Sequence, residues 1–242
     1  MAITHLLLDI EGTTCPVSFV AEVLFPYARR RLERFLSEHA DDPDVAALVN
    51  AVRERWQADP SAEARALAER GESVLAYLQW LIDHDIKDTA LKDLQGRIWR
   101  EGYASGALVA PLFDDVTVAL ERWHAQGLVL AVYSSGSVPA QQLLYGHTQA
   151  GDLTPLFSHW FDTRTGAKQE PASYRAICAA MGCTSTQVLF VSDSRTELEA
   201  AAAAGLAVLF SDREGNPGRD GGPFEKISDY STLGIGHGTH GP

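Results

Sequence analysis

Short apolar runs alternate with single helical patterns along much of this chain, and that alternation constrains its fold most strongly. Each run is bounded by Gly, Ser or Asp and is too short for a helix, which is typical of buried strands. Strands joined by single helices form right-handed βαβ units and a parallel sheet covered on both faces. The sequence therefore predicts an α/β fold with a doubly wound, Rossmann-like parallel sheet. The expected strands are Leu6–Ile10, Leu128–Tyr133, Val188–Val191 and Leu206–Phe210, with a weaker one near Trp160-Phe161.

Helices are expected between these strands, and their ends are marked by capping residues. Asp114 is a candidate N-cap for a helix over residues 116–126. Pro171 suits the first turn of a helix that runs to Met181, and an alanine-rich helix is expected over 196–204. The tail from Gly215 is rich in Gly and Pro and is expected to be loop.

The alternation of strand and helix patterns stops over one long stretch, where the apolar residues show only helical spacing. Polar linkers such as Asp41-Asp42-Pro43 divide it into separate helical patterns. We therefore expect an all-helical insertion over residues 19–106, between the first strand and the rest of the sheet. Residues 1–18 and 107–242 would form the α/β core.

The charge and cysteine content narrow the range of partners. A net charge of −12 argues against a nucleic-acid partner, because nucleic-acid binders usually carry a basic face. It still allows a small phosphorylated metabolite whose charge is met locally by a metal and a few cations. The three cysteines have neither metal-ligand spacing nor an even count, which suits a reducing cytosol, and no apolar run approaches the ~20 residues of a membrane span. We expect a cytoplasmic monomer with no nucleic-acid or membrane partner.

Two carboxylates follow the first strand directly. Asp9 and Glu11 are two residues apart, so on an extended segment they point to the same side. They would lie at the C-terminal end of a buried strand, where open α/β sheets bind ligands. Crowded carboxylates repel one another unless a cation or a shared proton intervenes, which indicates a hard-metal site.

This acid pair also suits phosphoryl transfer. The Asp9 carboxylate can attack phosphorus, while Glu11 could protonate the leaving oxygen and later deprotonate the attacking water. Gly12 would let the backbone turn sharply beside a ligand. The alternative is a strand-end turn with solvated carboxylates.

Hydroxyl groups follow the second predicted strand. Ser134 and Ser135 lie at a strand-to-helix turn, where hydroxyls and free backbone N–H groups form a phosphate cradle. Ser137 is also a candidate N-cap for the next helix, and the two roles can coexist.

Two later loops add a cation and a further acid. Lys168 would supply a compact positive charge for phosphate, with Arg164 as its nearest competitor. Asp193 ends a strand, and Glu197 lies one helical turn further on. Oxygen ligands from Asp9 and Asp193, completed by a backbone carbonyl, waters and phosphate, suit octahedral Mg²⁺. Alternatively Asp193 is an N-cap, and Glu197 complements the helix dipole.

An acid pair, then Ser, Lys and Asp in this order, resembles the haloacid dehalogenase superfamily of aspartate-dependent phosphohydrolases. The helical insertion sits where that superfamily carries a cap. Most members have Asp where this chain has Glu11, and in this respect the chain is similar to the enolase-phosphatases of methionine salvage. That resemblance runs from Leu6 to about Gly205. It rests on Asp9–Thr14, Ile98-Trp99, Gly102-Tyr103, Tyr133–Val138, Ala140-Gln141, Phe161–Thr163 and Ser173–Arg175.

The resemblance implies a role for each candidate residue. Asp9 would be the nucleophile and Glu11 the acid/base. One Mg²⁺ per subunit would be held by three carboxylates, those of Asp9, Glu11 and Asp193. The substrate, chiefly its phosphate, would be bound by Ser134, Ser135 and Lys168. Glu197 would brace the metal site without touching the metal.

The activity implied by the resemblance has two halves. The enzyme would enolise 2,3-diketo-5-methylthiopentyl 1-phosphate and then hydrolyse the phosphate monoester, giving the acireductone 1,2-dihydroxy-3-keto-5-methylthiopentene. Candidates for the enolisation base are Glu11, Glu72 and His84, and apolar residues near Phe19–Leu24 or Trp99–Tyr103 could hold the methylthio tail. Two other hypotheses stay open: a generic capped phosphatase for sugar phosphates or phosphoglycolate, and a catalytically silent binding module.

Overall fold

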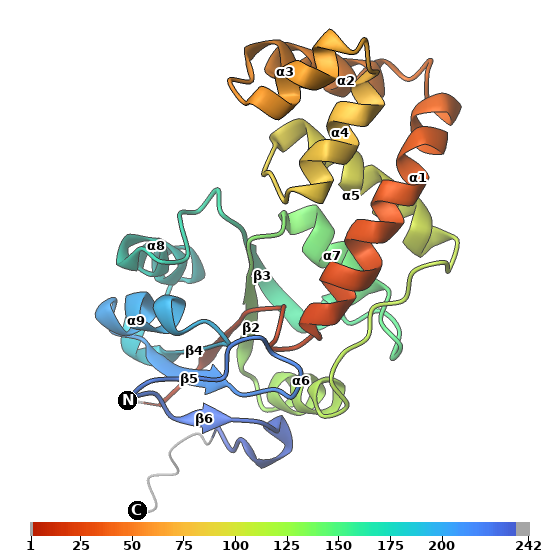
Figure 1. Ribbon diagram of the computed structural model, residues 1–242. Coiled ribbons are helices and arrows are strands. Elements are labelled where there is room, and N and C mark those ends of the chain that lie inside the picture. Colours follow the sequence, from red (N-terminus) through yellow and green to blue (C-terminus); the bar gives the residue numbers. More distant parts are fainter. Residues whose placement is uncertain (1, 236–242) are drawn as a thin grey trace, which may run out of the picture. The chain divides into compact units, whose positions relative to one another are not determined.

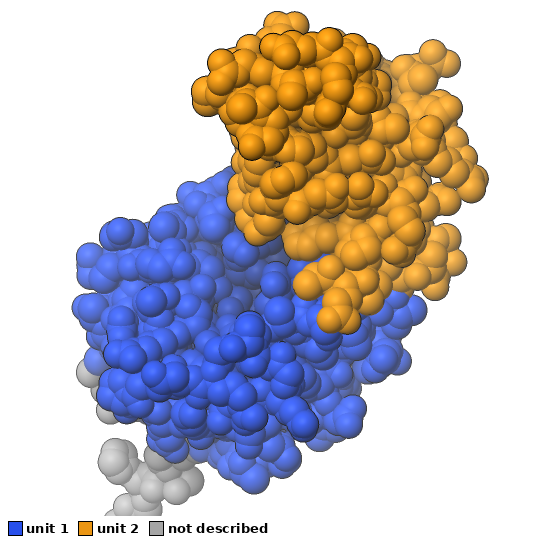
Figure 2. All heavy atoms as spheres, in the orientation of Figure 1, with its two compact units in different colours: residues 1–20, 109–242 blue, residues 21–108 orange. Residues whose placement is uncertain are grey.

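The computed structural model describes residues 2–235 and separates into two compact units. One unit comprises residues 1–20 and 109–242, and the other residues 21–108 (Figure 2). Within residues 2–235, the first unit has the predicted α/β fold, with six strands in the order β3-β2-β1-β4-β5-β6 and every neighbouring pair parallel. The strands are β1 (His5–Leu8), β2 (Val129–Tyr133), β3 (Phe157–Phe161), β4 (Val188–Ser192), β5 (Ala207–Ser211) and β6 (Lys226–Ile227).

The three central strands end together at one edge of the sheet. β1 lies between β2 and β4, and its last residue, Leu8, is in register with Val132 and Val191. The residues that follow these strands therefore emerge at the same carboxyl edge, where a doubly wound sheet binds its ligands. The Lys168 loop follows β3, whose last residue, Phe161, is in register with Tyr133 of β2, so all four predicted motifs begin at this edge.

Four helices cover the sheet, namely α6 (Val116–Ala125), α7 (Val138–Gly146), α8 (Pro171–Met181) and α9 (Arg195–Ala203). Helices α8 and α9 pack on one face through a core that includes Leu7, Tyr133 and Phe190, and α6 lies on the other side (Figure 1). As predicted, α8 begins at Pro171. It ends where Gly182 adopts a left-handed conformation with φ 68°.

The predicted N-cap at Asp114 is wrong. Helix α6 begins at Val116 after Asp115, and the Asp115 side chain does not cap it. Instead the Asp115 carboxylate pairs with Arg213 and accepts the backbone N–H of Tyr230. A distant partner therefore outcompetes the local helix end for this carboxylate.

The prediction that the chain after Gly215 is loop is partly wrong. Strand β6 extends the sheet because Phe210 donates its N–H to Glu225 and Asp212 donates its N–H to Ile227. A short 3₁₀ helix, η4 (Tyr230–Thr232), follows. The end of this predicted loop, residues 236–242, lies outside the described residues.

Residues 21–108, all of which the structure describes, contain helices and turns but no strand. A π-helical turn over Phe19–Leu24 leads into this unit, and a buried cluster that includes Leu32, Tyr77 and Leu94 forms its core. The predicted linker at Asp41-Asp42-Pro43 separates α1 from α2, and the Asp42 side chain accepts the N–H groups of the first turn of α2. The helices are α1 (Phe25–Glu38), α2 (Pro43–Ala58), α3 (Ala62–Glu69), α4 (Val74–Asp83) and α5 (Thr89–Ala104). No helix within residues 2–235 combines the length and the apolar character that crossing a membrane requires.

Candidate active site

A buried lysine joins two carboxylates at the carboxyl edge of the sheet. The Lys168 Nζ lies 2.8 Å from Asp9 Oδ1 and 2.6 Å from Glu197 Oε2, and none of the three residues is more than 8% exposed. The Ser192 hydroxyl lies 2.9 Å from Glu197 Oε2 and 3.2 Å from Asp9 Oδ2. The backbone N–H of Ile10 also donates to Asp9 Oδ1. These contacts fix the Asp9 carboxylate in one orientation.

The electrostatics of the cluster favour the charged form of Lys168 but shift Glu197 toward its protonated form. Burial alone lowers the pKa of Lys168, but the carboxylates of Asp9 and Glu197 outweigh burial and raise it above its ordinary value. Burial and the Asp9 charge raise the pKa of Glu197, although Lys168 opposes that shift. Lys168 therefore remains an ammonium ion at neutral pH and can attract a phosphate dianion.

The loop that carries Lys168 is fastened at three consecutive carbonyl groups. Tyr133 donates its hydroxyl to Gly166, Ser173 to residue 167, and Tyr174 to Lys168 itself, at 2.9, 2.7 and 2.7 Å. Gly166 has φ +151°, and a Cβ there would lie 2.2 Å from the Ser173 hydroxyl. Only glycine fits this close approach, which fixes the base of the lysine side chain.

Arg164, the other candidate for the cation that binds phosphate, lies outside the carboxylate cluster around Lys168. Its side chain is 79% exposed and pairs with Asp162, whereas Lys168 is 6% exposed within the carboxylate cluster. Asp162 also accepts the N–H groups of Val138 and Arg164. This carboxylate therefore fills the capping role at α7 that Ser137 was a candidate for, because the Ser137 side chain makes no capping bond.

The predicted phosphate-binding serines follow β2, the strand beside β1. Ser134 is buried and its hydroxyl accepts the N–H of Gly136, whereas Ser135 is exposed. Gln141 braces this turn by donating from its amide to the carbonyl oxygens of Gly136 and Phe161. Among residues 2–235, neither serine hydroxyl forms a hydrogen bond with Asp9 or Lys168, so their predicted contact with substrate stays a prediction.

Asp193 is a member of the cluster and not a helix cap. Helix α9 begins at Arg195 after Ser194, so the N-cap alternative for Asp193 is wrong. Burial, followed by the charges of Asp9 and Glu197, raises the pKa of Asp193 to about 7, and Glu11 adds to this repulsion. Within residues 2–235, the charges of Asp9, Glu197 and Glu11 repel the Asp193 carboxylate and that of Lys168 attracts it.

The turn after β1 brings Asp193 against the backbone. Gly12 has φ +67°, and a Cβ at this position would lie 2.1 Å from Asp193 Oδ2. The turn closes tightly, because the carbonyl of Ile10 accepts three successive N–H groups, from Thr13, Thr14 and Cys15. The glycine therefore leaves room for a carboxylate that any larger residue would displace.

The donors fit a hard divalent cation. Excess carboxylate charge at the carboxyl edge and the close approach of the Asp193 carboxylate to Gly12 both suit Mg²⁺, which is commonly bound through one or two carboxylates plus substrate oxygens and waters. Within residues 2–235, no group of three or more His, Cys, Asp or Glu side chains is arranged to hold a metal by itself. The predicted ligand set of Asp9, Glu11 and Asp193 stays a prediction.

Several side chains at this edge were not predicted to have a role. Ser192 bridges Asp9 and Glu197, and its position as the last residue of a strand just before Asp193 was the available signal. Three further donors, Ser211, Asn216 and Tyr230, come from the C-terminal segment and bind the turn after β1. Ser211 directly follows the predicted strand Leu206–Phe210, whereas no motif or periodicity marked Asn216 and Tyr230.

Other predicted residues lie in the helical unit. Glu72 and His84 are exposed, and the His84 ring Nδ1 contacts the Trp80 carbonyl oxygen at 2.9 Å. Trp99 donates its indole N–H to Leu24. The roles proposed for these residues from the sequence stay predictions.

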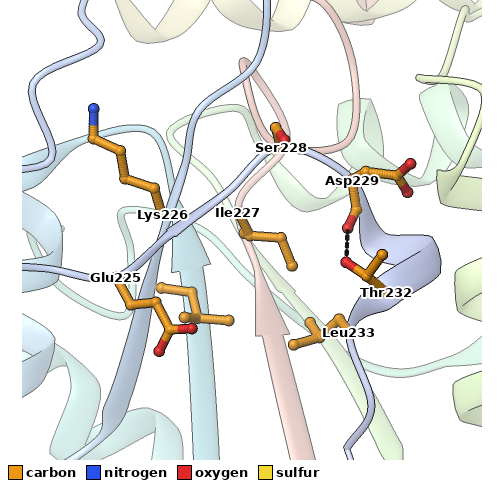
Figure 3. A pocket seen from close by; sticks show the side chains of 8 residues that line it. Glu225, Lys226, Ile227, Ser228, Asp229, Thr232 and Leu233 are labelled. Atoms are coloured by element: carbon orange, nitrogen blue, oxygen red, sulfur yellow. Dashed lines mark hydrogen bonds between the residues drawn. The ribbon is translucent and has the colours of Figure 1, made fainter.

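A separate hollow lies at the β6 edge of the sheet (Figure 3). It has a volume of about 220 Å³ and is lined by side chains of both charges, including Glu225, Lys226 and Asp229. None of its lining residues belongs to the carboxylate cluster around Lys168. This hollow is therefore not part of the candidate active site.

Comparisons with known proteins agree with this geometry. A family model described as haloacid dehalogenase-like hydrolase matches residues 3–205. Proteins named enolase-phosphatase E1 from Synechococcus elongatus and Prochlorococcus marinus are 51% and 50% identical, and each match covers 96% of this chain and 98% of the relative. The crystal structure of the UTR4 protein from Saccharomyces cerevisiae is similar with a TM-score of 0.77 and 34% identity, covering 96% of this chain and 100% of that one.

Proposed function

Because the chain belongs to the enolase-phosphatase E1 family of haloacid dehalogenase-like hydrolases, we propose that it acts on 2,3-diketo-5-methylthiopentyl 1-phosphate. It enolises this substrate and then hydrolyses the phosphate ester to the acireductone 1,2-dihydroxy-3-keto-5-methylthiopentene. The single observation that carries the phosphatase half is the buried Lys168 ammonium between the carboxylates of Asp9 and Glu197.

Phosphoryl transfer begins at Asp9. Its carboxylate, oriented by Lys168 and the Ile10 N–H, attacks phosphorus as the bond to the leaving oxygen breaks. Glu11 donates a proton to that oxygen, and it then takes a proton from the water that hydrolyses the aspartyl-phosphate. The products are the alcohol or enol and inorganic phosphate, and both carboxylates return to their starting states.

Positioning and charge neutralisation lower the barrier. Uncatalysed hydrolysis of phosphate monoesters is so slow that enzymes accelerate it up to ~10²¹-fold. Lys168 and the backbone N–H groups of the turn around Ser134 and Ser135 bind the phosphate oxygens in this proposal. The carboxylates of Asp9, Glu11 and Asp193 would hold Mg²⁺, which when bound would neutralise charge on the phosphate and polarise the substrate carbonyl.

The enolisation half requires a base beside the carbon next to a carbonyl. Glu11 is the candidate that belongs to the same unit as Asp9, whereas Glu72 and His84 are exposed residues of the helical unit. We assign Glu11 to this step. In our proposal the helical insertion, 19–106 in the sequence-based division, acts as the cap of a monomeric cytoplasmic enzyme.

The test uses purified protein and two substrates. Phosphate release from p-nitrophenyl phosphate should depend on Mg²⁺ and disappear in Asp9→Asn, with the variant still folded by circular dichroism. The diketo phosphate should give a transient ultraviolet absorbance from the enol before phosphate appears. Hydrolysis of sugar phosphates or phosphoglycolate without any reaction of the diketo phosphate would favour a generic phosphatase, and no hydrolysis of any ester would leave a binding module.

A further inference from the structure

The turn that follows Glu11 is held from one side by three side chains of the C-terminal segment. The Gly12 carbonyl accepts the Ser211 hydroxyl and the Asn216 amide N–H, both at 2.9 Å. The next carbonyl, that of residue 13, accepts the Tyr230 hydroxyl at 3.0 Å. Ser211 and Tyr230 are fully buried and Asn216 is 8% exposed. We call these three residues, Ser211, Asn216 and Tyr230, the C-terminal clasp.

The clasp is itself firmly anchored. Arg213 forms a two-pronged ion pair with Asp115, at 2.8 and 2.9 Å, and donates to the Ser228 carbonyl. The Arg213 guanidinium lies 4.3 Å from the centre of the Tyr230 ring. Asp115 also accepts the backbone N–H of Tyr230. A paired guanidinium stacked on a ring resists displacement, so the clasp is a rigid support.

The clasp fixes the backbone next to Glu11. The Gly12 N–H donates to the Cys15 carbonyl at 2.8 Å, and its own carbonyl is held by the clasp. Both peptide groups of Gly12 are therefore immobilised, including the planar peptide that contains the Glu11 carbonyl. A Cβ at Gly12 would lie 2.8 Å from Asn216 Nδ2 and 2.1 Å from Asp193 Oδ2, which shows how closely the turn, the clasp and the site pack.

The clasp lies beyond the part of the chain that the hydrolase family model matches. That match ends at residue 205, whereas the clasp begins at Ser211. Residues 3–205 include Asp9, Lys168 and Asp193, yet the support for the turn after Glu11 comes from outside that range.

We infer that Ser211, Asn216 and Tyr230 are positioning residues that hold Glu11 in the place where it protonates the leaving oxygen. This inference rests on the proposed phosphatase function. Misplacing a catalytic group by about 1 Å can lower a rate about 10²-fold, and general acid catalysis itself contributes about 10²- to 10⁴-fold. A loosened clasp therefore lowers kcat and leaves KM nearly unchanged, because Lys168 and the Ser134 turn still bind phosphate.

A comparison of two phosphate esters with different leaving groups distinguishes the positioning of Glu11 from a merely structural role of the clasp. p-Nitrophenolate leaves readily without a proton and its ester is not enolised, whereas the diketo phosphate needs Glu11 to take a proton during enolisation and to return one to the leaving enol oxygen. Loss of a positioned Glu11 must therefore slow turnover of the diketo phosphate far more than release of p-nitrophenolate. A variant that is simply less well folded would lose both activities in equal proportion.

The variants are Tyr230→Phe, which removes one hydroxyl, and the double variant Ser211→Ala/Asn216→Ala, which strips the Gly12 carbonyl of both side-chain donors. Thr148→Val is the matched control, because it removes a buried hydroxyl that donates to the Gly151 carbonyl at 2.7 Å in the same unit. We expect kcat for the diketo phosphate to fall about 10-fold in Tyr230→Phe and about 10²-fold in the double variant. For p-nitrophenyl phosphate the rate of the first-turnover burst of p-nitrophenolate, which precedes the water step that Glu11 also serves, should change less than about 3-fold, and the control should match wild type for both esters.

Amide hydrogen exchange over residues 10–15 provides a readout that is independent of activity. Exchange should be faster in both clasp variants and unchanged in Thr148→Val. Unchanged exchange, or an equal fall in diketo phosphate turnover and in the rate of the p-nitrophenolate burst, overturns the inference. A wild-type protein that hydrolyses neither ester would overturn the proposed function and the acid-positioning role together, while the exchange result still decides whether the clasp holds the turn.

Discussion

Replacing Lys168 by Met removes the one ammonium group at the centre of the carboxylate cluster and keeps a side chain of similar length. The carboxylates of Asp9 and Glu197, which lie 2.8 and 2.6 Å from the Lys168 Nζ, would then be buried without a cation. Removing one partner of a buried ion pair destabilises a protein by about 3–5 kcal/mol, because the remaining charge stays desolvated. Part of this destabilisation is offset, because the substitution also removes the free-energy cost of burying the lysine ammonium.

The remaining contacts set the expected magnitude. Asp9 keeps the Ile10 N–H and shares the Ser192 hydroxyl with Glu197. We therefore expect Lys168→Met to lower the free energy of unfolding by about 3 kcal/mol, near the lower end of that range. Without the positive charge on phosphate, kcat should also fall by about 10²- to 10³-fold.

Arg34→Met is a matched control, because Arg34 lies 2.6 Å from Glu38 but the two side chains are 65% and 44% exposed. Water and salt screen such a pair, so its loss should leave the free energy of unfolding nearly unchanged. Urea unfolding followed by tryptophan fluorescence measures both variants, and phosphate release at saturating substrate measures kcat. If Lys168→Met were no less stable than Arg34→Met, the argument that burial makes this ion pair essential would be refuted.

Three further predictions follow from the same geometry. Gly12→Ala should lose about 1–3 kcal/mol of unfolding free energy and most activity, because its Cβ meets Asp193. Gly71→Ala, at φ +69° with open space, should lose less unfolding free energy, because only the backbone strain of a positive φ applies there. Equal losses in urea unfolding would contradict the packing argument. Arg213→Lys should lower stability by about 1–3 kcal/mol, because lysine cannot replace the two-pronged bond to Asp115, and a melting temperature equal to wild type would show that the pair is dispensable. Chelation should abolish phosphate release, and Mg²⁺ should restore it better than the larger Ca²⁺; full activity in excess chelator would exclude a metal requirement.

Much of the catalytic edge was predictable because its signals are local. Strand ends are marked by apolar runs that stop at polar residues. Strand β2 ends at Tyr133 as predicted, whereas β1 ends two residues before the predicted Ile10 and β4 one residue after the predicted Val191. The sequence favoured Lys168 over Arg164 because a lysine completes the order of an acid pair, Ser, Lys and Asp along the chain. The structure supplies the physical reason, which is that Lys168 is buried against Asp9 whereas Arg164 is exposed.

Other features depend on partners far apart in sequence and leave no local signal. The Asp115 carboxylate pairs with Arg213 across 98 positions and is unavailable to cap its own helix. Strand β6 has only two residues and exists because β5 offers an unpaired edge. The clasp residues Ser211 and Tyr230 likewise act on backbone atoms near the other end of the chain, so no side-chain pattern identifies them.

The most direct test of the account follows purified protein with the diketo phosphate and Mg²⁺, recording enol absorbance and inorganic phosphate in one time course. The account predicts that absorbance rises before phosphate appears and that Asp9→Asn releases no phosphate. Phosphate release that persists in Asp9→Asn, or the absence of any reaction with this substrate in the wild-type protein, would contradict it.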